Sequence, residues 1–373
     1  MYMKYLRFSF FILFIATFTA CDNKTGSEKV DFDREAFLIN MADNVIQPSI
    51  EDFASKTEGL SVATNSFNIN LSLESLNVLR AELKETWLSY QHLAFVHVGP
   101  VSSVNLRDRV NIFPTKTDVI EDNITSQNYV LGSASNVAAK GFPALDYLLF
   151  GTAQTDEEIL AYFGDPNLGE NRLKYLSDLV EDIQTTSNIM SDGWADYRST
   201  FIGNTGTDVG SGTSLLVNEY NFQFDIRIKN AKIGFPSGGN PRTGGVLSPQ
   251  NVEGYFSGWS GDLAEKAVLS SIAVFKGEHF NSSEDGLGLD DYLNALDARD
   301  RNDELLSRAI INQSLAALEE MEKIEAPYSE VATTEGSQLV DVYNALQAVI
   351  PLIKVDMTSA LSVSITFQDN DGD

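Results

Sequence analysis

Helical periodicity runs through most of this sequence, and it constrains the fold more than any other feature. Apolar residues recur at three- and four-residue spacings, whereas the two-residue alternation of strands is nearly absent. The clearest helix covers 73–97, where Leu83, Tyr90 and His97 follow one another at seven-residue steps. The best candidate for a strand is the brief segment 362–367. The chain is therefore predicted to be all-α.

A loop-rich stretch divides the predicted helices into two groups. Glycine, threonine and serine cluster in 203–214, and helical periodicity resumes after it. We therefore expect two helical-bundle halves, an N-terminal bundle over 31–202 and a C-terminal bundle over 203–373. Pro48 and Pro351 should kink or interrupt the helices in which they lie. The other predicted helices are 34–56, 142–150, 154–163, 170–190, 215–232, 260–276, 289–297, 302–325 and 335–360.

The first residues have the organisation of a bacterial lipoprotein signal. Two basic residues precede the apolar run 8–18, which is too short for a stable membrane-spanning helix. Small residues then lead to Cys21, the only cysteine of the chain. We expect 1–20 to be a cleaved signal peptide, Cys21 to be lipidated and 21–30 to be a flexible tether. The alternative is an ordinary secretory signal, in which Cys21 has no such role.

A lipidated Cys21 would hold the mature protein at the bacterial cell envelope, on the outer membrane or the periplasmic face. The membrane would then be a partner through the lipid, and the chain would have no cysteine left for a disulfide, so packing of the core must stabilise it. The net charge is −27, and it becomes −29 without the two basic residues of the signal. Such an acidic chain repels nucleic acid, so no nucleic-acid partner is expected.

The sequence contains no familiar catalytic motif. It has no GxSxG, no HExxH, no phosphate-binding glycine loop and no cysteine nucleophile. Helix geometry predicts that His97 faces the interior of its bundle and that His92 faces outward. His97 is then either a satisfied core residue or a ligand that meets a carboxylate from a facing helix. No catalytic residue is assigned.

Four segments, in a fixed order, carry a family resemblance. They are 141–151 (GFPALDYLLFG), 232–236 (KIGFP), 252–258 (VEGYFSG) and the acidic end 367–373 (FQDNDGD). Together they resemble the imelysin-like proteins, whose signature region is similar to the first segment. The resemblance implies an all-α, two-bundle envelope protein, in many relatives lipid-anchored. Members of this family were first described as insulin-cleaving peptidases and are often linked to iron uptake, so the resemblance implies one of these activities.

The signature region departs from the Gly-x-His-x-x-Glu pattern of that family. Gly141 is kept, but Pro143 stands at the histidine position and Asp146 at the glutamate position. Imidazole and carboxylate one helical turn apart can share a cation, whereas proline offers no ligand atom. The alternative is structural, because Pro143 suits the first turn of a helix and the helix dipole favours Asp146 near it.

Three more acidic residues are candidate ligands. Glu253, in the VEGYFSG segment, either lines a cleft between the halves or caps a helix. Asp369 and Asp371 alternate as in the first half of a calcium loop, and a solvated tail is the alternative. His97, Asp146 and Glu253 are thus the candidate ligand or cleft residues. Any metal is expected at Asp146, Glu253, Asp369 or Asp371.

The broken signature favours binding over catalysis. The primary hypothesis is non-enzymatic capture of a metal ion, a metal complex or a peptide, and the resemblance suggests iron uptake as the process. Iron or another divalent cation is the cofactor that this hypothesis implies. The alternatives are a metallopeptidase of the imelysin type and an envelope scaffold that docks a partner protein.

Overall fold

The computed structural model describes residues 32–334 and 336–367. Every regular element within these residues is helical, and their β-type pairings are two isolated bridges. The all-α prediction is confirmed. The segment 362–367, which was the best candidate for a strand, forms none, because the chain leaves its last helix there without pairing to another segment as a strand.

Several predictions fall outside the described residues. These are the signal peptide 1–20, Cys21 with the tether 21–30, and the two aspartates Asp369 and Asp371. Among the described helices, none combines the length and the apolar character needed to cross a membrane.

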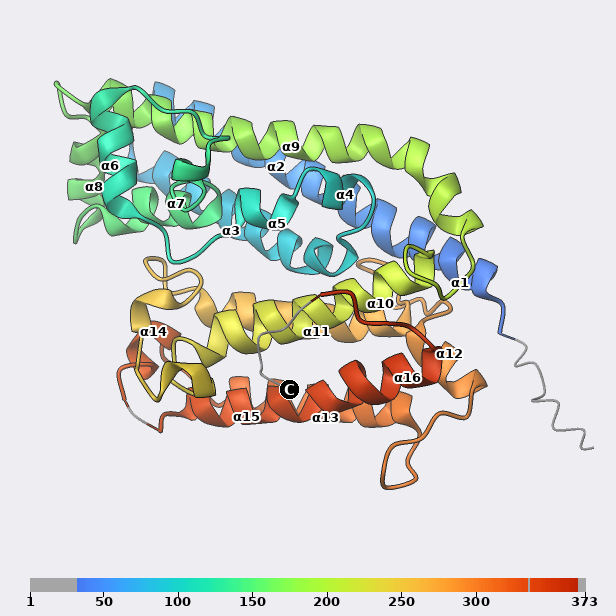
Figure 1. Ribbon diagram of the computed structural model, residues 1–373. Coiled ribbons are helices and arrows are strands. Elements are labelled where there is room, and N and C mark those ends of the chain that lie inside the picture. The colour runs from blue at the N-terminus through green and yellow to red at the C-terminus, as the bar shows by residue number, and fades with distance from the viewer. Residues whose placement is uncertain (1–31, 335, 368–373) are drawn as a thin grey trace, which may run out of the picture. The chain divides into compact units, whose positions relative to one another are not determined.

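The first layer of helices is built around α2, Gln47–Ile69, which packs against both α3, Leu73–Leu93, and α9, Gly169–Gly203 (Figure 1). A capping box between the side chains of Ser72 and Ser75 fixes the start of α3. Shorter helices complete the layer: α1 Arg34–Asn40, η1 Met41–Ile46, η2 Ala94–Val96, α4 Pro100–Ser103, α5 Leu106–Val110, α6 Thr117–Ser126, η3 Ala134–Asn136, α7 Phe142–Asp146, η4 Tyr147–Gly151 and α8 Asp156–Phe163.

The second layer contains α15, Gln338–Pro351, which packs against α13, Leu306–Met321, and against η5, Gln223–Gly234 (Figure 1). Helix α11 covers Ser260–Lys276, as the sequence predicts. The remaining elements are α10 Gly212–Phe222, η6 Pro241–Thr243, η7 Pro249–Asn251, α12 Leu289–Ala295, α14 Tyr328–Val331, η8 Leu352–Met357 and α16 Thr358–Leu361.

Helix α3 joins the two layers, because it packs against α2 on one side and against α11 on the other. The chain from Phe32 onward accordingly forms one compact unit. Helix α9 ends at Gly203 and α10 begins at Gly212, so the expected loop covers only the residues between them. The division into bundles over 31–202 and 203–373 stays a prediction.

Contact on both sides of α3 makes the prediction for His92 wrong. Only 4% of this residue is exposed, its Nδ1 lies 3.0 Å from Ser49 Oγ, and its ring meets Phe280 edge-on. Periodicity assigns one helix face to solvent, but α3 has a neighbour on that face as well. Helix α3 also ends earlier than predicted, at Leu93, so His97 lies in non-helical backbone.

Both prolines interrupt α-helical geometry, as predicted. Pro48 lies in the first turn of α2, directly after the π-helical η1. Pro351 ends α15, and the π-helical η8 follows it. Proline has no N–H to donate to the preceding turn, so the backbone changes to wider turns at these points.

Candidate functional site

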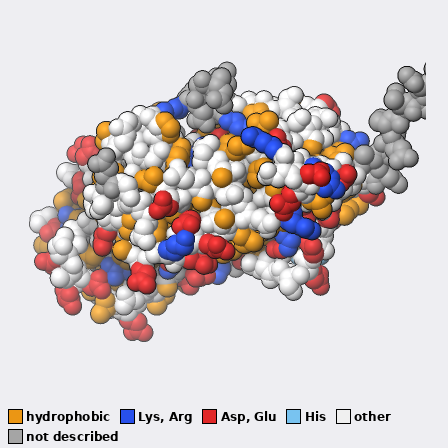
Figure 2. Space-filling view, turned by 90° about the horizontal axis from the view of Figure 1, so that it is seen from below, with side chains coloured by type: hydrophobic (Ala, Val, Ile, Leu, Met, Phe, Trp, Pro, Cys, Tyr) orange, Lys and Arg blue, Asp and Glu red, His pale blue; other side chains and the backbone are white. Residues whose placement is uncertain are grey.

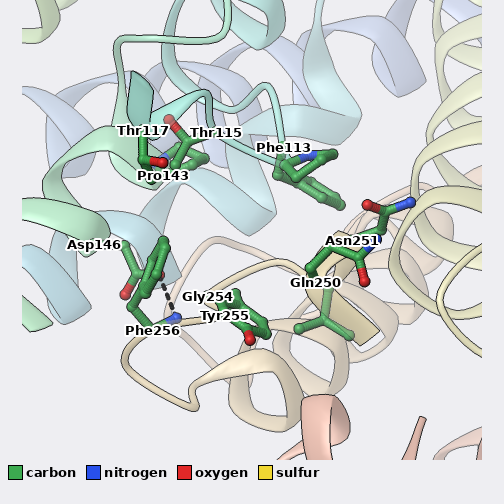
Figure 3. Close-up of a pocket in the computed structure, with 12 residues that line it drawn as sticks. Phe113, Thr115, Thr117, Pro143, Asp146, Gln250, Asn251, Gly254, Tyr255 and Phe256 are labelled. Atoms are coloured by element: carbon green, nitrogen blue, oxygen red, sulfur yellow. Dashed lines mark hydrogen bonds between the residues drawn. The ribbon is translucent and has the colours of Figure 1, made fainter. Parts of the chain in front are cut away.

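A cavity of about 350 Å³ lies between the signature helix α7 and the segment 250–256 of the second layer (Figure 3). We call it the aromatic cavity. One wall carries Phe113, Pro143 and Asp146, and the opposite wall carries Tyr255 and Phe256. The remaining lining residues are Pro114, Thr115, Thr117, Gln250, Asn251, Val252 and Gly254.

The start of α7 explains why the signature keeps its glycine. Gly141 has a φ of +73°, in the left-handed region that favours glycine. A Cβ atom at this position would lie 2.3 Å from the carbonyl oxygen of Val110, which is far inside contact distance. Pro143 occupies the first turn of α7, as expected. The two residues fix the direction of the helix that brings Asp146 to the cavity.

Asp146 is 1% exposed, and both of its oxygens are occupied. Oδ2 accepts a hydrogen bond from the backbone N–H of Phe256 at 2.9 Å, and Oδ1 accepts one from that of Ser257 at 3.0 Å (Figure 3). Burial raises the pKa of Asp146 to about 6, and the hydrogen bonds from Ser257 and Phe256 oppose this rise. The carboxylate therefore ties α7 to the opposite wall, a role that its position near the helix dipole did not predict.

Glu253 points into the protein rather than into an open cleft. Its Oε1 accepts hydrogen bonds from Asn111 Nδ2 at 2.7 Å, Trp87 Nε1 at 3.0 Å and Gln91 Nε2 at 3.1 Å. Its Oε2 forms an ion pair with Lys232 Nζ, which also donates to Gln91 Oε1 at 2.9 Å. These five side chains form the Glu253 cluster, and each is buried.

The Glu253 cluster joins the two layers, because Trp87 and Gln91 come from α3 and Lys232 comes from η5. Burial and the nearby Arg227 hold the pKa of Lys232 well below its ordinary value. With three donors on one oxygen and an ammonium on the other, Glu253 has little capacity to coordinate a ligand.

His97 lies in a third environment. It is buried, and neither ring nitrogen has a hydrogen-bond partner within the described residues. Its Nδ1 is 3.8 Å from Oε2 of Glu219, which forms an ion pair with Arg107. Burial, together with Arg107 and Arg227, lowers the pKa of His97 to about 3, so the ring is neutral at ordinary pH.

The three candidate residues thus have separate surroundings. Asp146 lines the aromatic cavity, Glu253 is enclosed by its own cluster, and His97 lies near Glu219. Within the described part of the chain, no three His, Cys, Asp or Glu side chains are grouped so that they could hold a metal ion. The donor atoms at Asp146 already serve backbone N–H groups, and Pro143 supplies none. These residues do not fit a bare metal ion.

Most residues of both sites were missed at the sequence level. Most of the lining of the aromatic cavity comes from loops and from helices of five residues or fewer, which are too short to show a periodicity. The Glu253 cluster had a weak signal, since Gln91 and Lys232 are polar residues inside otherwise helical, partly apolar segments. Buried polar groups need partners, so such residues indicate a buried network.

The molecule is an all-α protein with a small aromatic cavity between two helical layers. Comparison of its sequence with known protein families identifies the family. The imelysin (peptidase M75) family model matches residues 46–352. The chain belongs to the imelysin family.

Two solved structures share its fold. An imelysin-like protein from Psychrobacter arcticum 273-4 is 15% identical, with a TM-score of 0.66, over 90% of this chain and 97% of that one. A Parabacteroides distasonis ATCC 8503 protein named as an iron-regulated protein A precursor is also 15% identical, with a TM-score of 0.66, over 88% of this chain and 95% of that one. At this identity the likeness concerns the fold alone. No curated protein matches the chain.

Proposed function

We propose that this imelysin-family protein is a non-enzymatic binding lipoprotein of the bacterial envelope, anchored through Cys21, which captures a ligand in the aromatic cavity. The ligand is a peptide or a metal complex with an apolar or aromatic surface. The name of the Parabacteroides relative agrees with a link to iron, which would make an iron complex one candidate.

One observation carries the proposal: both oxygens of Asp146 accept backbone N–H groups inside a cavity walled by aromatic rings. A bare cation would have to displace these hydrogen bonds, and Pro143 offers no second donor. A ligand with an apolar face can pack against Phe113, Tyr255 and Phe256 and leave the hydrogen bonds of Asp146 intact. The amides of Gln250 and Asn251 line the same cavity and can orient a polar part of the ligand.

The metallopeptidase alternative is favoured by one feature of the same site. A carboxyl group with a pKa of about 6 in a cavity is suited to accept a proton near neutral pH. Its two backbone hydrogen bonds make it a poor base, because accepting a proton would weaken them.

The experiment uses the mature protein and insulin B chain as the probe. Calorimetry should detect binding that Tyr255→Ala and Phe256→Ala together weaken about tenfold or more, whereas Ile69→Ala, at an 87%-exposed apolar residue, leaves it unchanged. Mass spectrometry should find the peptide intact after long incubation with zinc or iron. Chelator-sensitive cleavage by tag-free protein would overturn the non-enzymatic proposal.

Two further measurements test the other parts of the proposal, that Asp146 holds no bare metal ion and that Cys21 carries a lipid. Equilibrium dialysis with ferrous, ferric, zinc and calcium ions should show no stoichiometric site that Asp146→Ala removes. Mass spectrometry of the mature N-terminus should find acyl chains on Cys21, and Cys21→Ser should release the protein from membranes. An unmodified Cys21 would contradict the anchor.

A further inference from the structure

A polar cavity of about 480 Å³ lies where the end of α3 meets α11 and the loop that follows α11. We call it the His92 cavity. It shares no lining residue with the aromatic cavity, so it is independent of the function proposed above. Its lining consists of His92 from α3, Lys266, Leu269, Ser270 and Ala273 from α11, and Glu278, His279, Phe280, Asn281, Ser282 and Ser283 from the loop.

The hydrogen bonds of His92 decide which of its ring nitrogens can bind a ligand. Ser49 Oγ donates its proton to the carbonyl oxygen of Val45, so it accepts from His92 Nδ1, which lies 3.0 Å away. Burial and the nearby Lys266 lower the pKa of His92 to about 3, so the ring is neutral and Nε2 carries no proton. Nε2 has no hydrogen-bond partner within the described residues. A side chain that is only 4% exposed therefore keeps an unused acceptor beside the cavity.

Ser270 is a second buried residue with unused hydrogen-bonding capacity. It is 2% exposed, and its Oγ has no partner among the described residues, although serines in helices commonly bind the carbonyl group one turn earlier. Buried polar groups are rarely left without a partner, because nothing then compensates for the loss of water. Such a hydroxyl group in the lining of a cavity indicates that a ligand supplies the missing hydrogen bond.

Lys266 brings a positive charge to the cavity. It forms no ion pair or hydrogen bond with any residue that the structure describes. Among the described lining residues the only carboxylate is Glu278, which already pairs with Lys276. His279 likewise has its Nδ1 3.1 Å from Glu284. Within this part of the chain the cavity therefore has one unpaired cation and no unpaired carboxylate, which suits a ligand with one negative charge and offers no counter-charge to an ammonium group.

Backbone hydrogen bonds hold the loop side of the cavity in place. The N–H of Phe280 donates to the carbonyl oxygen of Asn44 at 2.8 Å, and the N–H of His279 donates to that of Glu284 at 2.9 Å. The ring of Phe280 meets that of His92 edge-on, with 4.7 Å between the ring centroids. The polar groups of the loop are thus held near those of α3 and α11 before a ligand arrives, as in a preorganised site.

The charge of the whole protein restricts which anions can reach Lys266. The net charge of the chain is −27, and on the face drawn in Figure 2 acidic side chains are spread widely whereas basic side chains gather in a few small groups. Such a protein repels large polyanions. A small molecule with one negative charge meets far less repulsion than an anionic polymer does.

We propose that the His92 cavity binds a small sugar acid, a molecule with several hydroxyl groups and one carboxylate. The carboxylate pairs with Lys266, and one ligand hydroxyl donates to His92 Nε2. Another hydroxyl gives Ser270 the partner that it lacks within the described residues. Hydroxyl groups both donate and accept, which matches the amide of Asn281 and the hydroxyl of Ser282 in the same lining.

Calorimetric titration of the mature protein with glucuronate and with galacturonate tests the proposal. Glucose and galactose are the paired probes, because each has a hydroxymethyl group where the acid has its carboxylate. At least one acid should bind saturably, and its neutral partner should bind about tenfold more weakly or less, because the pair with Lys266 is lost. Lys266→Met should lower the affinity for the acid to that for the neutral sugar.

Lys323→Met is the matched control, since Lys323 is exposed and does not line the cavity. It removes the same charge from the protein and should leave the affinity unchanged.

Ser270→Ala is a second and independent test. It should weaken binding of the acid about threefold or more, because one hydrogen bond to the ligand is lost. Urea unfolding of the free protein should show no loss of stability, because the hydroxyl that is removed has no partner among the described residues. A merely structural role of Ser270 would give the opposite result, a loss of stability with unchanged affinity.

The proposal is overturned if neither acid binds saturably, or if both acids bind no more tightly than their neutral partners. It is also overturned if Lys266→Met and Lys323→Met have the same effect on the affinity, because binding would then occur elsewhere on the protein.

Discussion

Lys229 and Lys232 lie three residues apart in η5, yet their surroundings differ fundamentally. Lys232 faces the first layer, where Glu253 and Gln91 enclose it in the Glu253 cluster. Lys229 faces α15, where it meets Asp225 and Gln347 beside a cavity of about 710 Å³ in the second layer. One helix therefore carries a one-to-one ion pair on one side and, on the other, a lysine that shares its carboxylate with a second lysine.

The difference shows how the same residue type serves two purposes. In the Glu253 cluster one cation meets one carboxylate, and neutral donors from Trp87 and Asn111 satisfy the remaining capacity of that carboxylate. Around Asp225 two cations share one carboxylate. The first arrangement pairs one cation with one carboxylate and holds two layers together, whereas in the second one carboxylate serves two cations from different helices.

Breaking the one-to-one pair should have the largest effect. Glu253→Gln leaves Lys232 buried without a counter-charge, and such losses cost about 3–5 kcal/mol. Urea unfolding of the variant at neutral pH measures this free energy directly.

The matched control for this prediction is the double change Glu253→Gln and Lys232→Met, which removes both charges and should recover much of the loss. A single variant that loses less than about 1 kcal/mol would contradict the prediction, because it would mean that Lys232 and Glu253 do not face each other as a charged pair in the folded protein.

Asp146 is an intermediate case, because this carboxylate is buried like Glu253 but faces N–H groups instead of a cation. Burial raises its pKa from 3.8 to about 6. The unfolded chain thus releases this proton at lower pH than the folded chain does. The contribution to stability is present below pH 3.8 and is lost as the pH rises through 6.

The expected measurement is the difference in unfolding free energy between the wild type and Asp146→Asn, followed from pH 4 to pH 7. As the pH rises over this range, the wild type should lose stability relative to Asp146→Asn. The loss should be at most about 3 kcal/mol, since one pKa unit corresponds to about 1.4 kcal/mol. His92 and His97 titrate in both proteins, so their contributions cancel. A difference that does not change with pH would contradict the raised pKa.

The helices were predictable from the sequence because their apolar periodicity is local. Helix α11 agrees with its predicted range, and both prolines interrupt α-helical geometry as expected. His92 shows where this reasoning fails, since periodicity does not reveal that α3 is covered on both sides. The place of α3 between two layers depends on contacts with helices far away in the sequence.

The candidate site was predictable only in part. Asp146 lines a cavity, but the residues whose backbone N–H groups it accepts, Phe256 and Ser257, lie more than a hundred residues away in the chain. Glu253 lies in the same segment as Tyr255 and Phe256, which line the cavity, yet its own side chain binds Trp87 and Lys232 instead. Which side chains of a short irregular segment face a cavity is decided by tertiary packing, and the sequence pattern does not contain it.

The comparison of Lys229 with Lys232 predicts a smaller loss of stability when the lysine that faces α15 is changed. Lys229→Met removes one cation from Asp225, but Lys354 stays within reach of the same carboxylate. The loss should therefore be about 1–3 kcal/mol, the scale of charged hydrogen bonds, and smaller than that of Glu253→Gln under the same conditions. Urea unfolding of both variants in one buffer tests the order. If Lys229→Met costs more than Glu253→Gln, then the pair of Lys229 and Asp225 is as closed as the Glu253 cluster, and the contrast between the two sides of η5 disappears.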